Sequence, residues 1–487
     1  MMNVQTPPTL MQLARQALLR NEALATSALE KLPRELFPGL FKDAFQGRHA
    51  RVVKAMVEAW PFPCLPVGTL MKTPNLETFL ALLDGMDTHL DRRFHPRREN
   101  LQVLDLRQVS YDFWRIWTGR ESGDGTAETV EEKRVVKVLP RYAMRRRLKV
   151  IVELCLWPNM REEQACFLQW AQQRKGSLQL LCTKMKIKAL PVCTIKSLLN
   201  FQPQHIEELD LYLVYDLSSL ECFVPCLGQM RSLHKLSLTF IKNTWRFGNR
   251  TTDTEEECAR TLISQFPKFN CLQHLSLIGV YFMRNHMEQL FRCLTTPLET
   301  LTTTGFHLSQ RDLNYFPLCH NLCQLKHLDM SGVVLSPLDP MPLQVLLQNV
   351  ADTLQSLDLQ GCRMKDSHLT HLIPALSQCS KLTKLNLYDN DFSTPILKDL
   401  LYHTANLRKL SVEQYPAPLQ CYDESGCISV ERFSHLCDEL MDILRARRQP
   451  KGVSFAAYIC RKCAARCVYD LATRLCYCLP LSREYDL

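Results

Sequence analysis

The chain has 487 residues, of which 46% are hydrophobic and 22% are charged, a composition typical of a folded protein rather than a disordered one. No apolar run reaches the roughly 18 residues that span a bilayer, so no membrane segment is predicted. The N-terminal stretch lacks a basic region followed by an apolar core, so we predict no signal peptide, and the 22 cysteines are expected to be reduced thiols. The formal net charge of +9 favours acidic partners or residence in the nucleus.

Residues 1–100 are predicted to form a helical cap that carries two short docking patterns. The segment from Thr9 to Gln12 fits a capping box, in which each of these side chains bonds a backbone N–H of the first helical turn. Apolar residues at helical spacing after Thr9 fit the elongin-C-binding box, and a second stretch fits the cullin-2 box, where Pro38 and Gly39 argue against one uninterrupted helix. An ordinary core-facing stripe would show the same spacing. The elongin-C-box residues are Thr9, Leu10, Ala14 and Leu18, and the cullin-2-box residues are Leu32, Pro33, Leu36 and Leu40.

Residues 101–200 are predicted to hold irregular first repeats and a polar interruption. The segment Leu101–Leu106 reads as an isolated repeat-like strand, and residues 118–147 lack apolar periodicity, which predicts a flexible insertion. A basic cluster between residues 133 and 149 suits either a nuclear-import signal or a solvated loop. Direct nucleic-acid binding is not expected, because no aromatic stacking platform accompanies this charge.

The motif Leu-x-x-Leu-x-Leu recurs from residue 206 to residue 412 at intervals of 25 to 29 residues, with a single step of 39. This period, with a helical segment after each strand, predicts a leucine-rich repeat solenoid of α/β class, a horseshoe with parallel strands inside and helices outside. The long step after Leu233 carries KNTWRFGNRTTDTEEECAR, which we interpret as an insertion on the rim. Solenoids present long concave surfaces to ligands, so the function expected is binding rather than catalysis.

The residues between the motif leucines are expected to line the concave face, since side chains alternate along a strand. They form two columns, which are either a ligand face or merely solvated positions. The candidate binding residues are Lys235, His274, His327, Asp329, Asp358, Lys384, Asn386 and Lys409.

The last segment, residues 416–487, is predicted to be a C-terminal cap with a helix from Glu431 to Arg447 and a cysteine cluster. The spacing of Cys460, Cys463, Cys476 and Cys478 is similar to that of the ligands in a four-thiolate structural zinc site. The alternative is a reduced, cysteine-rich cap without metal. No other cofactor is predicted.

No enzyme motif is present in the sequence, since it lacks a phosphate-binding glycine loop, a G-x-S-x-G elbow and an H-E-x-x-H pair. Two LxxLL motifs, Leu343–Leu347 and Leu397–Leu401, have the spacing that nuclear-receptor coactivators use. Both fall on predicted repeat helices, so their leucines are expected to be buried.

Several long segments resemble the PRAME (preferentially expressed antigen in melanoma) family. They are residues 28–72, 101–117 and 212–238 and the C-terminal CRKC…CYC, so the resemblance covers essentially the whole chain. It implies a non-catalytic substrate receptor of a cullin-2 RING ubiquitin ligase, joined through elongin B and C, in cytoplasm and nucleus. It also implies effects on transcription, differentiation, proliferation and apoptosis, and a nuclear receptor or chromatin protein as a further candidate partner.

Three functions are therefore compared. The first is the ligase receptor, with the regular array of residues 201–415 holding an unknown protein substrate. The second is a nuclear corepressor that acts by binding alone. The third, an inhibitor of the ribonuclease-inhibitor type, ranks last because an inhibitor of a basic nuclease should be acidic and this chain is basic.

Overall fold

The computed structural model describes residues 9–72, 75–91, 101–107, 114, 147–157, 160–174, 176–188, 202–214, 217–241, 253–305, 307–424, 426–460, 463–470 and 473–474. The chain separates into two compact units, residues 1–185 and residues 186–487. Within the described residues, no helix is both long enough and apolar enough to cross a membrane.

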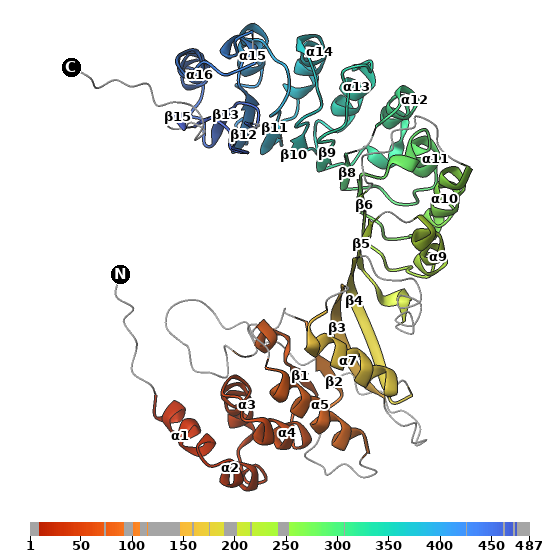
Figure 1. The fold of residues 1–487 in the computed structure, drawn as a ribbon, viewed down its shortest axis with the longest axis vertical. Coiled ribbons are helices and arrows are strands. Elements are labelled where there is room, and N and C mark those ends of the chain that lie inside the picture. Colours follow the sequence, from red (N-terminus) through yellow and green to blue (C-terminus); the bar gives the residue numbers. More distant parts are fainter. Residues whose placement is uncertain are drawn as a thin grey trace, which may run out of the picture. The chain divides into compact units, whose positions relative to one another are not determined.

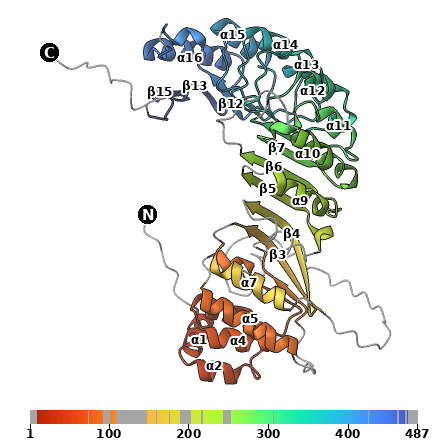
Figure 2. The ribbon, with the colours of Figure 1, turned by 45° about the vertical axis from the view of Figure 1, so that its right-hand side comes forward.

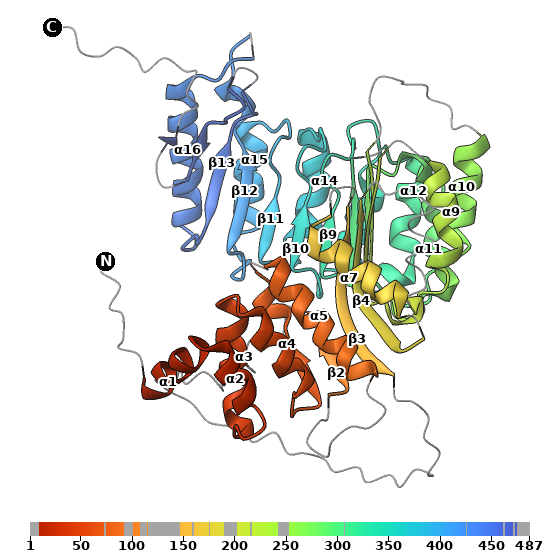
Figure 3. The ribbon, with the colours of Figure 1, turned by 60° about the horizontal axis from the view of Figure 1, so that its bottom comes forward.

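Unit 1 combines a group of helices with a short sheet whose strands follow one another in chain order. Figure 3 shows α1 and α2 at the outer edge of the helices, while α3 to α5 lie nearer the strands. The helices are α1 (Leu10–Leu19), α2 (Glu22–Ala28), α3 (Phe37–Gln46), α4 (Ala50–Glu58), α5 (Leu76–Asp91) and α7 (Glu162–Gln173), with 3-10 turns η1 (Arg34–Leu36) and η2 (Gly68–Lys72). The strands are β1 (Cys64–Pro66), β2 (Val103–Asp105), β3 (Leu148–Leu156) and β4 (Leu178–Lys188), the last of which ends in unit 2.

An aromatic cluster forms the core of unit 1. Phe41 of α3 packs edge-on against Trp60 at 5.3 Å between ring centroids and stacks on Trp114 at 5.8 Å. The indole N–H of Trp114 donates to the carbonyl oxygen of Pro66 at the end of β1 (2.7 Å), so the cluster ties α3 to the sheet. β1 pairs in parallel with β2, and the sequence had not predicted a strand within the first 100 residues.

Unit 2 is a leucine-rich repeat array, in which most strands are followed by a helix (Figures 1 and 2). Its strands are β5 (Glu208–Val214), β6 (Lys235–Ile241), β7 (His274–Ile278), β8 (Thr300–Thr304), β9 (His327–Asp329), β10 (Ser356–Asp358), β11 (Lys384–Asn386), β12 (Val412–Pro416), β13 (Val453–Ala456), β14 (Val468–Tyr469) and β15 (Thr473–Arg474). Its helices are α9 (Leu217–Leu227), α10 (Asp253–Ile263), α11 (Met287–Arg292), α12 (Gln310–Tyr315), α13 (Met341–Asn349), α14 (Asp366–Leu376), α15 (Thr394–His403) and α16 (Val430–Arg445). The 3-10 turns are η3 (Pro203–His205), η4 (Phe266–Lys268), η5 (Tyr281–Met283), η6 (Phe316–Leu318), η7 (His320–Leu322) and η8 (Leu419–Cys421).

The predicted solenoid is confirmed by the strand pairing of unit 2. From β5 to β13 each strand pairs in parallel with the next, and the motif leucines are aligned, with Leu209 opposite Leu236 and Leu275 opposite Leu301. These four leucines are completely buried. Burial of one such side chain stabilises the fold by about 2 kcal/mol, so the repeated motif supplies much of the core. The strands lie on the inner side of the curve and the helices on the outer side (Figure 2).

The long step after Leu233 needs a correction. Its second half is not a rim insertion, because the segment from Asp253 forms helix α10, with Cys258 and Leu262 buried in the repeat core. Three acidic residues in its first turn, Asp253, Glu255 and Glu256, stabilise the helix N-terminus. Residues 242–252, the first half of the predicted insertion, lie outside the described residues.

Candidate functional site

Helix α1 presents apolar side chains to solvent. Its capping box is present, with Thr9 accepting from the backbone N–H of Gln12 (3.2 Å) and the Gln12 side chain accepting from the N–H of Thr9 (2.8 Å). Leu10 is 86% exposed, and Leu13 and Ala14 are exposed as well. The alternative that this stripe packs into the core is therefore wrong for Leu10 and Ala14, whereas Leu18 is half-buried.

The opposite side of α1 holds the helix to unit 1. Arg15 and Leu19 are buried, and the Arg15 Nε lies 2.8 Å from a carboxylate oxygen of Asp43 on α3. A charged residue thus faces inward while leucines face water, the reverse of an ordinary surface helix. Contiguous exposed apolar side chains of this kind mark interaction surfaces.

The cullin-2-box residues do not share one exposed face. The segment passes from the 3-10 turn η1 into α3, so the box is not one uninterrupted α-helix, but Pro38 and Gly39 themselves lie in the first turn of α3. Pro33 is exposed and Leu36 is half-buried. Leu40 is only 1% exposed, so its side chain belongs to the core of unit 1. Leu32, like Leu36, is half-buried.

On the concave face of unit 2, strand register places the first column in one line. Lys235 lies opposite His274, which lies opposite Thr300, followed by His327 on β9. Ser356 and Lys384 continue the line on β10 and β11.

The predicted place of Lys409 in this column is wrong. Val412 lies opposite Lys384, whereas Lys409 is exposed in the turn before β12. Strand β12 starts three residues later than the leucine motif indicated, because Glu413 rather than Leu410 lies opposite the motif leucine Leu385.

The second column, in which Asp329, Asp358 and Asn386 lie opposite one another on β9 to β11, has a structural role in the later repeats. The Asp329 carboxylate accepts from the backbone N–H of Ser331 (2.9 Å), and Asp358 accepts from that of Gln360 (3.1 Å). Asn386 bonds Tyr388 in the same way (3.1 Å). These are Asx turns that end each strand. Asn386 is 4% exposed and also donates to Asp358 (2.9 Å), so it is a poor candidate for ligand contact.

An open hollow of about 650 Å³ lies where β5 to β8 begin. It contains two predicted residues, Lys235 and His274, and others that the leucine motif did not single out. The lining residues are Glu207, Glu208, His234, Lys235, His274 and Thr300. Two of the missed residues, Glu208 and Thr300, occupy the same register position as Lys235 and His274 on neighbouring strands, so a comparison of the strands by motif position would have found them.

Electrostatics around the hollow are set by neighbouring side chains. Burial lowers the pKa of His274, whose Nδ1 lies 2.9 Å from the Thr300 hydroxyl. The hydrogen bond from Lys326 (2.7 Å) lowers the pKa of Glu299, so this carboxylate stays ionised and paired. At neutral pH the first column therefore presents a lysine, a neutral imidazole and a hydroxyl.

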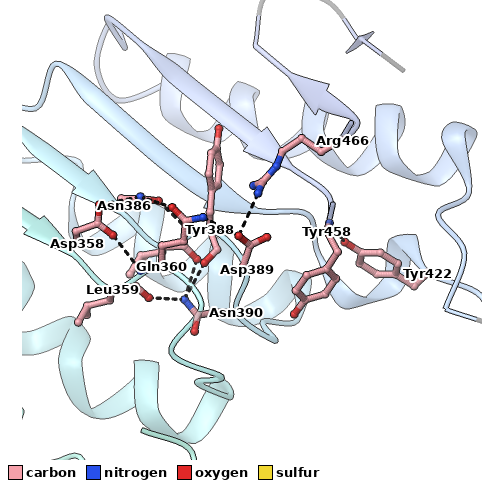
Figure 4. A network of polar contacts seen from close by, with 11 residues as sticks. Asp358, Leu359, Gln360, Asn386, Tyr388, Asp389, Asn390, Tyr422, Tyr458 and Arg466 are labelled. Atoms are coloured by element: carbon pink, nitrogen blue, oxygen red, sulfur yellow. Dashed lines mark hydrogen bonds and ion pairs between the residues drawn. The ribbon is translucent and has the colours of Figure 1, made fainter. Parts of the chain in front are cut away.

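A polar network joins the C-terminal cap to the loop after β11 (Figure 4). Arg466 donates to Asp389 (3.2 Å) and lies 5.3 Å from the Tyr388 ring centroid, while Gln360 donates to the same carboxylate (2.8 Å). Tyr458 donates to Asp391 (2.6 Å). The cap therefore covers the end of the repeat core, as terminal repeats must.

The proposed zinc ligands are only partly within the described residues. Cys460 and Cys463 lie in the cap, whereas Cys476 and Cys478 fall outside. Among described residues no group of three or more His, Cys, Asp or Glu could hold a metal ion. Cys258, Cys362 and Cys379 are free thiols, and burial raises their pKa to about 12, as expected for small core residues.

Some of the remaining predicted motifs lie in the core, and others lie outside the described residues. The leucines of both LxxLL motifs are buried, with Leu347 and Leu401 completely covered, which confirms packing as their role. The insertion at 118–147 and the basic cluster lie outside the described residues, apart from Arg147 and Lys149.

Parallel strands, outer helices and aligned buried leucines define a leucine-rich repeat protein. Residues 7–114 match the PRAME N-terminal domain and residues 148–478 match the PRAME C-terminal domain. The chain belongs to the PRAME family. It is 43% identical to PRAME family member 12 of Homo sapiens, with 98% of each chain covered.

Two mouse proteins are similar to nearly the same extent. Preferentially expressed antigen in melanoma-like protein 7 of Mus musculus is 42% identical over 98% of this chain and 99% of its own length. Oogenesin-3 of Mus musculus is 40% identical, covering 97% of this chain and 94% of its own. Among solved structures, the leucine-rich repeat-containing protein LegL7 from Legionella pneumophila matches with a TM-score of 0.34 and 16% identity over 61% of this chain and 98% of its own.

Proposed function

We propose that this protein is a non-catalytic substrate receptor of a cullin-2 RING ubiquitin ligase. Helix α1 would dock elongin C, the following segment would contact cullin-2, and the concave face of unit 2 would hold the protein substrate. The observation that carries the proposal is the exposure of Leu10 and Ala14 on a capped helix whose Arg15 faces inward. A helix-in-groove contact needs accessible apolar anchors one turn apart, which α1 provides.

The cullin-2 contact is the weaker half of the proposal. Leu40 is buried and can act only by supporting the segment before it. Pro33 is exposed and Leu36 is half-buried, so they are the side chains that a cullin subunit could reach. Downstream effects on transcription and proliferation, in cytoplasm or nucleus, would follow from removal of the bound target. The receptor would act by raising the local concentration of target lysines near the recruited E2 enzyme.

Capture by immobilised elongin B/C with cullin-2 tests this proposal. Wild-type full-length protein is compared with Leu10→Asp and with Pro33→Ala, both at positions where the side chain is exposed, so the fold is retained. We expect Leu10→Asp to reduce elongin capture at least tenfold, because it buries a charge in an apolar groove. Leu318→Asp is the matched control, since Leu318 is 73% exposed in unit 2.

The competing interpretation is a nuclear corepressor that acts by binding alone. It predicts that Leu10→Asp leaves chromatin association and reporter repression unchanged while elongin capture is lost. Deletion of the first 45 residues is unsuitable for this comparison, because Phe41 and Phe45 belong to the core of unit 1. Capture of Leu10→Asp equal to wild type would remove α1 as the docking element.

A further inference from the structure

Hydrogen-bond donors fill both concave columns on three adjacent strands. The six column positions of β6, β7 and β8 hold no carboxylate and no Phe, Tyr or Trp, and every side chain can donate a hydrogen bond. Ser237, at 9% exposure, is almost covered by its neighbours. The six residues are Lys235, Ser237, His274, Ser276, Thr300 and Thr302, aligned by strand register.

Carboxylates border this group of six donors on both sides. Glu207 and Glu208 lie at the β5 side of the hollow, and Asp329 follows Thr302 on β9. Neighbouring strands are about 4.8 Å apart, so the two borders are separated by roughly 19 Å. The donor region therefore accommodates a short anionic group but repels a long run of negative charge.

The other charges near the donors are paired within the protein. Lys326 binds Glu299 beside Thr300 (2.7 Å), and Lys186 lies 3.2 Å from Asp210 on β5. Lys235 is exposed at the rim of the hollow, and His234 donates from Nδ1 to the carbonyl oxygen of Ser232 (2.7 Å). Lys235 is thus the cation that is placed to meet an anion entering the hollow.

We propose that the hollow over β6–β8 binds one oxyanion, a carboxylate or a phosphate, carried by an extended protein segment with basic residues on both sides. The anion would accept from Lys235, from the Thr300 hydroxyl and, once the imidazole is protonated, from Nε2 of His274, whose Nδ1 is bonded to Thr300. The flanking cations would meet Glu207 and Asp329. In such an interface, charge complementarity determines which residue of the bound segment enters the hollow. The inference rests on the proposed function, because it names the chemistry of the target that the receptor would hold.

A nucleic acid fits this surface less well than a protein segment. Its backbone places a phosphate on every nucleotide, and those beyond the hollow would meet the carboxylates on either side. The six donor positions also hold no Phe, Tyr or Trp ring on which bases could stack.

Binding of labelled peptides to the full-length protein, followed by fluorescence anisotropy, tests the inference. The probe is a short synthetic peptide with a central glutamate and arginines near both ends. Parallel peptides carry phosphoserine, which distinguishes phosphate from carboxylate, or glutamine, which removes the anion. We expect Lys235→Gln to weaken binding of the glutamate or the phosphoserine peptide about tenfold, the usual effect of one charge-assisted hydrogen bond. Lys409→Gln, which removes an exposed lysine outside the strands, should leave binding unchanged.

Binding of the glutamate peptide should also strengthen as the pH falls from about 7.5 to about 5.5. The groups that face His274 are Glu299, Lys235, His327, Glu208 and Thr300. Because burial lowers the His274 pKa, the unliganded imidazole is neutral near pH 7, and a bound anion would raise this pKa and favour proton uptake. His274→Gln should therefore reduce this pH dependence.

Three outcomes would overturn the inference. They are equal binding of the glutamate and glutamine peptides, unchanged affinity of Lys235→Gln, and tighter binding of an all-acidic peptide or a single-stranded RNA. Elongin capture is measured on the same variants. If the wild-type protein is captured by elongin but binds none of the anionic peptides, the oxyanion site alone is rejected. If the wild-type protein binds the glutamate or phosphoserine peptide but is not captured, the ligase role is rejected.

Discussion

Helix α1 of unit 1 and helix α15 of unit 2 have similar leucine spacing but opposite environments. In α15 the leucines at positions 397, 400 and 401 are completely buried against neighbouring repeats. In α1 the leucines at positions 10 and 13 are exposed, and Arg15 takes the inward position. An amphipathic pattern thus identifies a helix and its apolar face, but whether that face meets the core or a partner depends on what packs beside it.

The largest effect is expected from a buried ion pair of unit 2. Arg448 binds Glu413, whose side chain is fully buried and also accepts from the Tyr415 hydroxyl (2.7 Å). Arg448→Met leaves that carboxylate without its cation and should lower the free energy of unfolding by about 4 kcal/mol. Urea denaturation measures it, with the exposed Arg445→Met as control, and equal midpoints for the two variants would contradict this expectation.

The second effect sharpens the contrast between the two helices directly. Leu397→Ala removes a completely buried side chain of α15 and should cost about 3 kcal/mol of stability, since both transfer and cavity terms apply. The melting temperature of the full-length protein, measured by differential scanning calorimetry, reports it. A loss below about 1 kcal/mol would show that the repeat relaxes around the cavity.

A smaller effect is expected at the concave face. Asn386→Ala removes an Asx turn at the end of β11 and the hydrogen bond to Asp358, and should destabilise the protein by about 1 to 2 kcal/mol. Peptide binding at the hollow should be unaffected, because Asn386 lies three strands beyond β8. If the variant instead kept its stability but lost ligand binding, Asn386 would be a contact residue.

The smallest effect on stability is expected for α1 itself. Leu10→Ala should change the free energy of unfolding by less than about 0.5 kcal/mol, because the side chain is 86% exposed. Elongin capture should nevertheless fall, and the ratio of binding loss to stability loss is the measure of a docking surface. A destabilisation near that of Leu397→Ala would break the comparison between α1 and α15.

Sequence alone determined the solenoid, because each repeat packs the same leucines against its neighbours and the motif therefore survives as a regular period. It also determined the Thr9 capping box, which depends on contacts within one turn. The buried LxxLL leucines followed from their place on repeat helices. The family could be identified from segments that cover most of the chain.

Only the tertiary structure decided which surfaces are accessible. It showed that Leu10 is exposed while Leu40 is buried, that Val412 rather than Lys409 continues the first column, and that Asn386 is engaged in a turn. It also brought Glu208, Lys235, His274 and Thr300 to one hollow from four strands. The physical reason is that exposure and strand register depend on neighbours distant in sequence, whereas the leucine period and the helix cap are local.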